Sequence, residues 1–364
     1  MTKHRKPHAK SRHGCLQCKE RHTKCDEFHP QCMQCRRQQI SCSFSSPNLA
    51  VMPLNEDSLA DLELLEYWHR YPLIPGMPQQ AKHLEHGYVQ LGFSHHYLLN
   101  SILSLAALQR FNGDRSCTRW YLRAVAHQQA AISRVKPHLQ GLETSTSHHK
   151  AVLAFSTFTS LYAVTEPLLR LKRVGCGSSP NFDPVAEFIR VIQIGRSTSI
   201  FVQQHLSSLI HMDPFMASKF SSHQLAYAGD LEARFPQLGL VQSFIEQYPD
   251  ENEHKAVCLH AAKLVFTYMA VFFDSMQGQR QTRVIFAWVN EVQNPFLDLC
   301  SRRHPLALAI LAHFAALMSL NRGAWFTQSW SQLLLEDIRY TLDGWEDIIQ
   351  WPMGIVMQSD VTTI

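Results

Sequence analysis

The sequence lacks the two features that would direct a chain to secretion or into a membrane. Its first residues are polar and basic and contain no apolar segment of the kind found in a secretory leader. The longest apolar run, Pro305 to Leu320, is interrupted by His313 and falls short of the roughly 20 residues that a spanning helix needs. We therefore expect a protein of a reducing compartment without a membrane partner.

Motifs of enzyme active sites are also missing. The chain has no Walker A loop, no G-x-S-x-G nucleophile elbow and no H-E-x-x-H zinc motif. The adjacent pairs His95-His96 and His148-His149 lack a helical i, i+4 partner set with a nearby acid, so we interpret them as ordinary surface or core histidines. These absences predict that the protein is not an enzyme.

Acidic side chains are scarce at the N-terminal end. Residues 1–46 hold ten Lys and Arg against the three acids Glu20, Asp26 and Glu27, a net charge of +7. The other 24 basic and 27 acidic residues give the rest of the chain a net charge of −3. A basic end on a slightly acidic body indicates a polyanion as the partner of that end alone.

Cysteine is concentrated in the same end of the chain. Six of the ten cysteines follow the spacing Cys15-x2-Cys18-x6-Cys25-x6-Cys32-x2-Cys35-x6-Cys42. The second three repeat the first three at a displacement of 17 residues. Two tetrahedral zinc ions need eight ligand positions, and six thiolates fill them only if two cysteines bridge both metals. Since the first cysteine of each half is equivalent in the repeat, the bridges it suggests are Cys15 and Cys32.

The segment between these cysteines has too few apolar side chains to fold alone. Its large apolar residues are Leu16, Phe28, Met33 and Ile40. A structural zinc contributes roughly 10–16 kcal/mol to folding, which favours metal over a disulfide framework or chance clustering. All six thiolates would be ligands and would leave no position for a catalytic water. The sequence therefore predicts two structural Zn²⁺ ions.

Basic side chains follow each Cys-x2-Cys pair. The six residues 19–24 can form one or two helical turns, and the equivalent second segment begins with Arg36-Arg37. A short helix held by metal at both ends would present these side chains to a DNA groove, with phosphate contacts giving most of the affinity and base contacts the specificity. The alternative is that the charges only solvate a small module. The candidate DNA-binding residues are Lys19, Arg21, His22, Lys24, Arg36 and Arg37.

This segment closely resembles the binuclear zinc cluster domain of fungal transcription factors over residues 12–44. The resemblance is carried by Gly14-Cys15, Lys19, Arg21-His22, Lys24-Cys25-Asp26-Glu27 and Pro30. It implies that Cys15 and Cys32 bridge the zinc ions, that the first helix enters the major groove of DNA, and that CGG-like half-sites are read. It also implies a nuclear regulator of RNA polymerase II promoters, in many relatives those of one metabolic or biosynthetic pathway.

His22 stands where many members of that family carry a base-reading lysine. A histidine donates only one good hydrogen bond to a guanine edge, so the triplet that is read can differ. Base reading and phosphate contact both stay open for His22.

The rest of the chain shows helical spacing of apolar residues and no convincing strand alternation. We expect a small two-zinc cluster module followed by a mainly all-α regulatory domain. The predicted layout is a disordered basic tail at 1–11, the zinc cluster at 12–44, a linker at 45–56, the helical domain at 57–352 and a tail at 353–364.

Individual helices are indicated by their apolar stripes. Leu59, Leu62, Leu65 and Trp68 form one such stripe, Ser94 is a plausible N-cap for the segment that follows it, and Asp183-Pro184 is a good helix start. A final helix is predicted to place on one face Leu335, Ile338, Leu342, Trp345 and Ile349. For the acidic stretch 336–347 this stripe favours a packed helix over an activation segment.

The helical region resembles the regulatory region of fungal factors of the sterol uptake control type. The similarity is carried by Phe93-Ser94-His95, Leu98-Leu99, Ile102-Leu103, Leu105 to Leu108, His127-Gln128, Pro305 to Ala307, Ala312 to Ala315, Trp325, Trp330 and Trp351-Pro352. In such relatives this domain can bind a hydrophobic small molecule. The alternative functions are therefore a sterol- or lipid-sensing regulator and, from another class, an enzyme with an accessory zinc module. Because the linker is too short for a coiled coil, any homodimer would form through the helical body.

Overall fold

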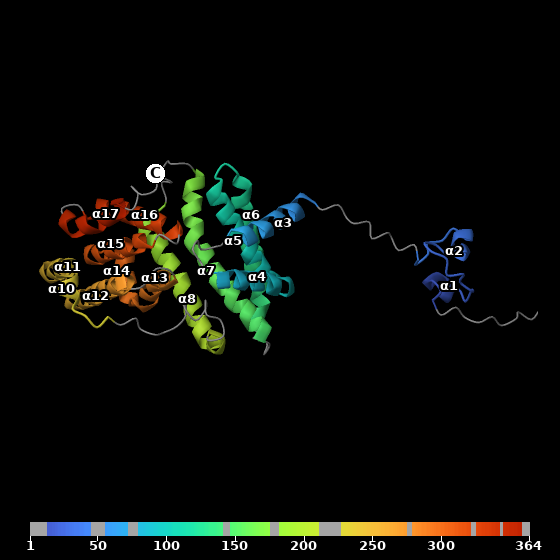
Figure 1. Cartoon of the computed structure of the whole chain (residues 1–364), viewed down its shortest axis with the longest axis horizontal. Coiled ribbons are helices and arrows are strands. Elements are labelled where there is room, and N and C mark those ends of the chain that lie inside the picture. Colours follow the sequence, from blue (N-terminus) through green and yellow to red (C-terminus); the bar gives the residue numbers. More distant parts are fainter. Residues whose placement is uncertain are drawn as a thin grey trace, which may run out of the picture. The chain divides into compact units, whose positions relative to one another are not determined.

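The computed structural model describes nine stretches of the chain: 13–44, 55–71, 79–140, 146–174, 182–210, 227–274, 279–321, 325–342 and 345–358. The chain divides into two compact units, Met1–Ala60 and Asp61–Ile364, which are described separately. All the regular secondary structure in the described stretches is helical (Figure 1). The predicted tail 1–11 and nearly all of the predicted linker 45–56 lie outside the described residues.

The N-terminal unit contains two short helices, α1 (Leu16–Glu20) and α2 (Met33–Arg37). Each helix begins after a cysteine and ends with the same backbone motif. In α1, His22 adopts a left-handed φ of 51° and the Thr23 N–H bonds the Cys18 carbonyl at 3.0 Å. The same geometry recurs in α2, 17 residues later. Gln39 adopts a left-handed φ of 53°, and the Ile40 N–H donates to the Cys35 carbonyl at 3.1 Å. The repeat in the cysteines is thus a repeat in the backbone.

The helical body contains fourteen helices within its described residues. They are α3 (Glu56–Arg70), α4 (Gln79–Ser94), α5 (His96–Gly113), α6 (Thr118–Gln140), α7 (Thr146–Val174), α8 (Pro184–Ile210), α10 (Leu231–Arg234), α11 (Pro236–Gln247), α12 (Asn252–Asp274), α13 (Gln279–Glu291), α14 (Asn294–Ser301), α15 (Pro305–Leu320), α16 (Trp325–Thr341) and α17 (Glu346–Gln358).

Two of these helices, α5 and α15, are buried on nearly every side and organise the body. Helix α5 packs against α4, α6 and α7, and α15 packs against α12, α16 and α17. Between these groups α8 contacts α7 as well as α13, α14 and α16. Helix α15 is apolar on nearly every side and has no face for water, so its neighbours must enclose it, whereas α5 is enclosed although it also buries Asn100, Ser101 and Ser104.

Polar contacts fasten α3 to the body. Asp61 pairs with Arg123 of α6, and its Oδ1 lies 3.1 Å from Nε2 of His127. Nδ1 of His127 in turn lies 3.1 Å from Oδ1 of Asn100 on α5. Ala60, Leu64 and Trp68 bury the apolar face of α3, whereas Leu59 and Leu62 are about half exposed. The stripe thus predicted the helix correctly, but two of its four residues, Leu59 and Leu62, are not on the buried face.

Two further expectations concern the first residue of a helix. Asp183 caps α8 through its Oδ1, which accepts the Ala186 N–H at 2.9 Å, so this predicted start is confirmed. Ser94 is not an N-cap: it ends α4, and α5 begins after His95. The corner is tight because a Cβ on Gly92 would lie 3.2 Å from the Cα of Leu99.

The predicted final helix is two helices. Helix α16 ends at Thr341 and α17 begins at Glu346. Of the expected face, Leu335, Ile338, Leu342 and Ile349 are buried, whereas Trp345 is 43% exposed. The sequence between the two helices includes Gly344, and glycine is a weak helix former. Helix α17 continues to Gln358, past the predicted domain end at 352. Within 336–342 the alternating burial fits the packed helix rather than an extended acidic segment.

Two helices in the described part of the chain meet the length and hydropathy of a membrane span, Ser147–Arg173 in α7 and Asn252–Asp274, and α14 with α15 would add a third as a bent pair. Of their most apolar windows, 67% in α7 and 50% in α12 is buried inside the body. The absence of a membrane partner stays a prediction.

The buried His313 of α15 predicts an acid-sensitive core. Its ring packs between Phe266 and Trp351, and burial lowers its pKa to about 4. Below about pH 6.5 this histidine is protonated in the unfolded chain but stays neutral in the folded chain until about pH 4. Its contribution should therefore lower the free energy of unfolding by about 2 kcal/mol between pH 7 and pH 5.

We expect His313→Leu to remove that part of the acid-dependent loss. Urea unfolding followed by tryptophan fluorescence measures it, because all seven tryptophans lie beyond residue 60 and report the helical body. The exposed His260 provides the control His260→Leu, which should keep the wild-type pH dependence. An equal loss in the wild type and in His313→Leu would contradict this role.

Candidate metal centre and nucleic-acid interface

Six cysteine side chains form the core of the N-terminal unit. Each is at most 3% exposed, and the apolar side chains packed against them are Ile40 and Phe44. Leu16 and Phe28, by contrast, are 60% and 58% exposed. The unit therefore has a centre of sulfur rather than of hydrocarbon.

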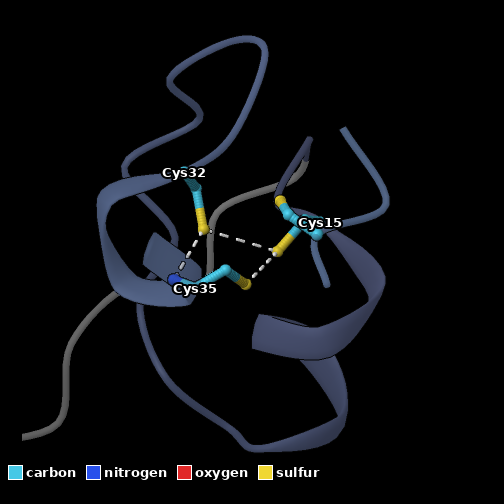
Figure 2. A group of neighbouring side chains, drawn as sticks. Cys15, Cys32 and Cys35 are labelled. Atoms are coloured by element: carbon cyan, nitrogen blue, oxygen red, sulfur yellow. Dashed lines mark hydrogen bonds between the residues drawn. The ribbon is translucent and has the colours of Figure 1, made fainter. Parts of the chain in front are cut away.

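The spacing of the sulfur atoms matches tetrahedral metal coordination (Figure 2). The Cys15 Sγ lies 3.7 Å from that of Cys32 and 3.6 Å from that of Cys35, and the Cys18 and Cys32 Sγ atoms are 3.7 Å apart. A disulfide would need about 2.05 Å, and all six thiols are free. Four sulfurs at 2.3 Å from one zinc lie about 3.8 Å from each other in a regular tetrahedron. The donor set fits zinc.

The thiols fall into two groups of four. Cys15, Cys18, Cys25 and Cys32 form one group, and Cys15, Cys32, Cys35 and Cys42 form the other, each with its sulfur atoms within 4.8 Å of one another. The two groups share Cys15 and Cys32. This is the arrangement in which six thiolates supply eight ligand positions.

Backbone N–H groups surround the sulfur atoms. The sulfurs of Cys15 and Cys32 cap α1 and α2 by accepting the N–H groups of Cys18 (3.4 Å) and Cys35 (3.3 Å). The Cys25 sulfur accepts the N–H groups of Cys15 and Glu27, both at 3.4 Å. Such donors stabilise negative charge on sulfur, which is the form that binds metal.

The pKa values reflect a crowded, buried centre. Burial raises the pKa of the Cys15, Cys18, Cys32 and Cys35 thiols. For Cys42 burial also raises the pKa, but backbone hydrogen bonds with Cys32 and Phe44, together with side-chain hydrogen bonds from Cys15 and Cys32, outweigh it and lower the pKa to about 7. Because metal binding needs thiolates, loading this centre releases protons and weakens at low pH.

Polar contacts join the two halves around the centre. The Leu16 N–H donates to Oγ of Ser43 at 2.8 Å, and the Ser43 N–H donates to Oε1 of Gln17 at 2.7 Å. In the segment that joins the two helices, the carboxylate of Asp26 accepts the N–H of Met33, the first residue of α2, at 3.0 and 3.1 Å. These bonds fix the start of α2 and the end of the module relative to α1.

The helix that was expected to follow Cys18 lies earlier in the chain. Helix α1 begins at Leu16, inside the Cys-x2-Cys pair, and ends at Glu20, because the Cys15 sulfur caps it and His22 closes it in a left-handed conformation. Lys19 is therefore helical, whereas Arg21, His22 and Lys24 follow the helix. The second segment is placed as its repeat requires, with Arg36 and Arg37 in the last turn of α2.

The candidate DNA-binding side chains are all exposed. This holds for Lys19, Arg21, His22, Lys24, Arg36 and Arg37. Among the described residues none of the six forms an ion pair with a carboxylate, so the charges of the two lysines and three arginines are available to an external anion. Their individual roles stay predictions.

The helical body contains an apolar cavity beside Phe188, Phe326 and Trp330. Its volume of about 70 Å³ is far below the roughly 300–1,000 Å³ of sites that enclose drug-sized ligands. A sterol would need the surrounding helices to move apart.

A second group of metal-ligating side chains escaped the sequence analysis. Asp250, His254 and His304 bring their ligand atoms within 4.8 Å of one another in the helical body. The i, i+4 spacing of Asp250 and His254 was a signal for it, but His304 lies 50 residues further along the chain. Of the isolated cysteines, Cys258 and Cys300 are buried and Cys117 is partly exposed, whereas Cys176 lies outside the described residues.

Comparison with known proteins agrees with this geometry. Residues 13–49 match the family model of the fungal Zn(2)-Cys(6) binuclear cluster domain, a domain that binds two zinc ions. A "Zn(2)-C6 fungal-type transcription factor" of Gibberella zeae is 49% identical over 45 residues, 12% of this chain and 9% of that protein. The "Zn(2)-C6 fungal-type transcription factor afumD" of Aspergillus fumigatus is 26% identical over 216 residues, 50% of this chain and 57% of that protein.

These relatives are transcription factors by name, a class without enzymatic activity. The matched segments span less than two thirds of the relatives' own lengths. No solved structure matches the chain. The more specific similarity of the helical body to the sterol uptake control type stays a prediction.

Removal of one shared thiol should empty the centre. We expect Cys32→Ala to lower the zinc content of the full chain by about two ions, because both groups of four lose a ligand. Elemental analysis of the purified protein measures this. Cys117→Ala, which removes a thiol outside the cluster, should leave the zinc content unchanged, and a Cys32→Ala protein with full zinc content would contradict the shared-ligand arrangement.

Proposed function

We propose, on the premise that residues 13–49 form a fungal binuclear zinc cluster domain, that this protein is a zinc-dependent, sequence-specific DNA-binding regulator of transcription. The observation that carries the proposal is the sulfur core, which holds two equivalent short helices and leaves their basic side chains exposed. In this proposal the protein binds RNA polymerase II promoters in the nucleus, and the genes that it regulates belong to a metabolic or biosynthetic pathway.

The zinc ions have a structural role in this proposal. Cys15 and Cys32 bridge the two ions, while Cys18, Cys25, Cys35 and Cys42 each bind one. With four thiolates around each zinc, no position is left for a catalytic water. The metal thus supplies folding free energy and rigidity, and the protein side chains supply recognition.

DNA affinity comes mainly from the cationic side chains. Lys19, Arg21, Lys24, Arg36 and Arg37 are fixed within a few residues of buried cysteines, so binding costs less side-chain and backbone ordering than for a mobile basic tail. Each phosphate that they neutralise releases counterions and makes binding salt-dependent.

Sequence reading belongs to residues at the end of α1. Lys19 can approach a guanine from the helix, and His22 follows in its fixed left-handed turn. A single hydrogen bond from His22 would discriminate bases less than a bidentate contact, so the half-site is CGG-like with a tolerance at one position. The small volume of the apolar cavity gives the sterol-sensing alternative no support of its own.

Selection from a random duplex pool tests this proposal directly. The full chain should enrich a CGG-like motif, and Cys32→Ala should enrich none, because the centre that positions the contacts is lost. Salt-sensitive binding without any enriched sequence would overturn sequence-specific reading and leave only a basic zinc-stapled anchor.

Phosphate contacts and base contacts are separated by their response to salt. For Arg37→Gln we expect the slope of log K against log salt concentration to fall by about 0.9, with the selected sequence unchanged. For His22→Lys we expect the selected triplet to shift or sharpen. The exposed Arg302 of the helical body gives a matched charge control, Arg302→Gln, which should leave the slope as in the wild type. A slope unaffected by Arg37→Gln would exclude this residue from the phosphate contacts.

A further inference from the structure

One carboxylate and two imidazoles lie close together in the helical body. Asp250 lies in the connection between α11 and α12, His254 lies in the first turn of α12, and His304 stands between α14 and α15. Nδ1 of His254 is 3.0 Å from Oδ1 of Asp250, and Nε2 of His304 is 3.1 Å from Oδ2 of the same carboxylate. All three ligand atoms lie within 4.8 Å of one another.

The backbone holds each of these residues in place. Arg303 takes a left-handed φ of 56°, and the His304 N–H bonds the Leu299 carbonyl at 3.0 Å, which closes α14. His304 is at the same time the N-cap residue of α15. Oδ1 of Asp250 accepts the Glu251 N–H at 2.8 Å. The group is therefore positioned before any ligand arrives.

One oxygen of this group lacks a hydrogen-bond donor among the described residues. The Asp250 side chain is 10% exposed, and its buried Oδ2 accepts no hydrogen bond from any described residue. Nε2 of His304 lies 3.1 Å from it, a contact that is an ion pair only if the ring is protonated, and Nδ1 of the same ring is also buried without a hydrogen-bond partner among the described residues. A buried carboxylate oxygen without a donor is costly unless a cation is its partner.

The pKa values of the group are shifted downward. Burial raises the pKa of Asp250, but the bonds from His254 and the Glu251 N–H outweigh it, so the net shift is downward. Burial lowers the pKa of His304 despite the nearby carboxylate. The case for a ligand rests on the convergence of the three ligand atoms.

We propose that Asp250, His254 and His304 form a third metal site, which binds a divalent transition-metal ion of the zinc type in the helical body. Two imidazoles select against calcium and magnesium, which prefer oxygen ligands, and one carboxylate with two imidazoles is a donor set that zinc accepts. The partly exposed His254, at 32% of its side chain, leaves the site open to solvent and to an entering ion.

The site differs in kind from the zinc cluster of the N-terminal unit. It contains no thiolate, and its three ligands leave a coordination position for water. Its ion ties the α11–α12 connection to the α14–α15 corner. The simpler reading, an Asp250–His254 hydrogen bond with His304 beside it and no metal, is the other outcome of the test.

The zinc content of the purified full chain, equilibrated in a zinc-buffered solution, decides between the two. The wild type should hold about one ion per chain more than His254→Gln and about one more than His304→Gln. His260→Gln, on the same helix and exposed, should equal the wild type. Equal zinc content in the wild type and in both ligand variants would overturn the proposal.

Cobalt substitution keeps the test decisive if a variant folds poorly. Titration of metal-free wild type with Co²⁺ should first give the intense near-ultraviolet charge-transfer bands of thiolate ligands, from the cluster. A further equivalent should then add only weak visible bands, without thiolate charge transfer, and this increment should persist in His260→Gln. A titration that ends when the thiolate bands are complete would overturn the third site.

Discussion

Contact between sulfur atoms is the constraint on which the N-terminal unit depends. Six thiols occupy the volume that a hydrophobic core fills in a larger domain, and their separations of 3.6–3.7 Å are those of a metal-centred tetrahedron. Two helices of five residues each would not form alone in water. Their caps, their ends and the positions of their basic side chains all follow from where the cysteines lie.

The helical body meets the opposite situation, because it has an ample apolar core. Fourteen of the sixteen residues of α15 are buried, and the stacked rings of Trp288 and Phe314, with centroids 3.8 Å apart, add a dense contact between α13 and α15. Such a core needs no metal for its folding. An ion at Asp250, His254 and His304 therefore acts on an already folded domain, where it can join two connections and adjust how they sit without deciding whether the domain forms.

Local rules predicted what depends on neighbours in sequence. The cysteine repeat, the helical class and the cap at Asp183 were all available from spacing and residue type. The buried face of α3 was only half predicted, because Leu59 and Leu62 have the spacing of a core stripe but the surface that covers α3 selects Ala60, Leu64 and Trp68. Which of two apolar faces is covered is decided by residues far away in the chain.

The helix that was expected after Cys18 and the group of Asp250, His254 and His304 were mispredicted for related reasons. Spacing between cysteines does not reveal that a sulfur atom caps the helix and so shifts its start to Leu16. Asp250 and His254 were visible as a pair, but the approach of His304 depends on the corner between α14 and α15. Sites assembled by tertiary packing carry at most part of their signature in local sequence.

The backbone repeat of the N-terminal unit separates shape from chemistry. Displaced by 17 residues, His22 corresponds to Gln39 and Lys24 to Ser41, in turns of the same conformation. The backbone is thus pseudo-symmetric, whereas the side chains at equivalent positions differ. Because the two turns have equivalent backbones, the backbone alone does not distinguish one orientation of the module on a ligand from the other. The different side chains at equivalent positions set that orientation.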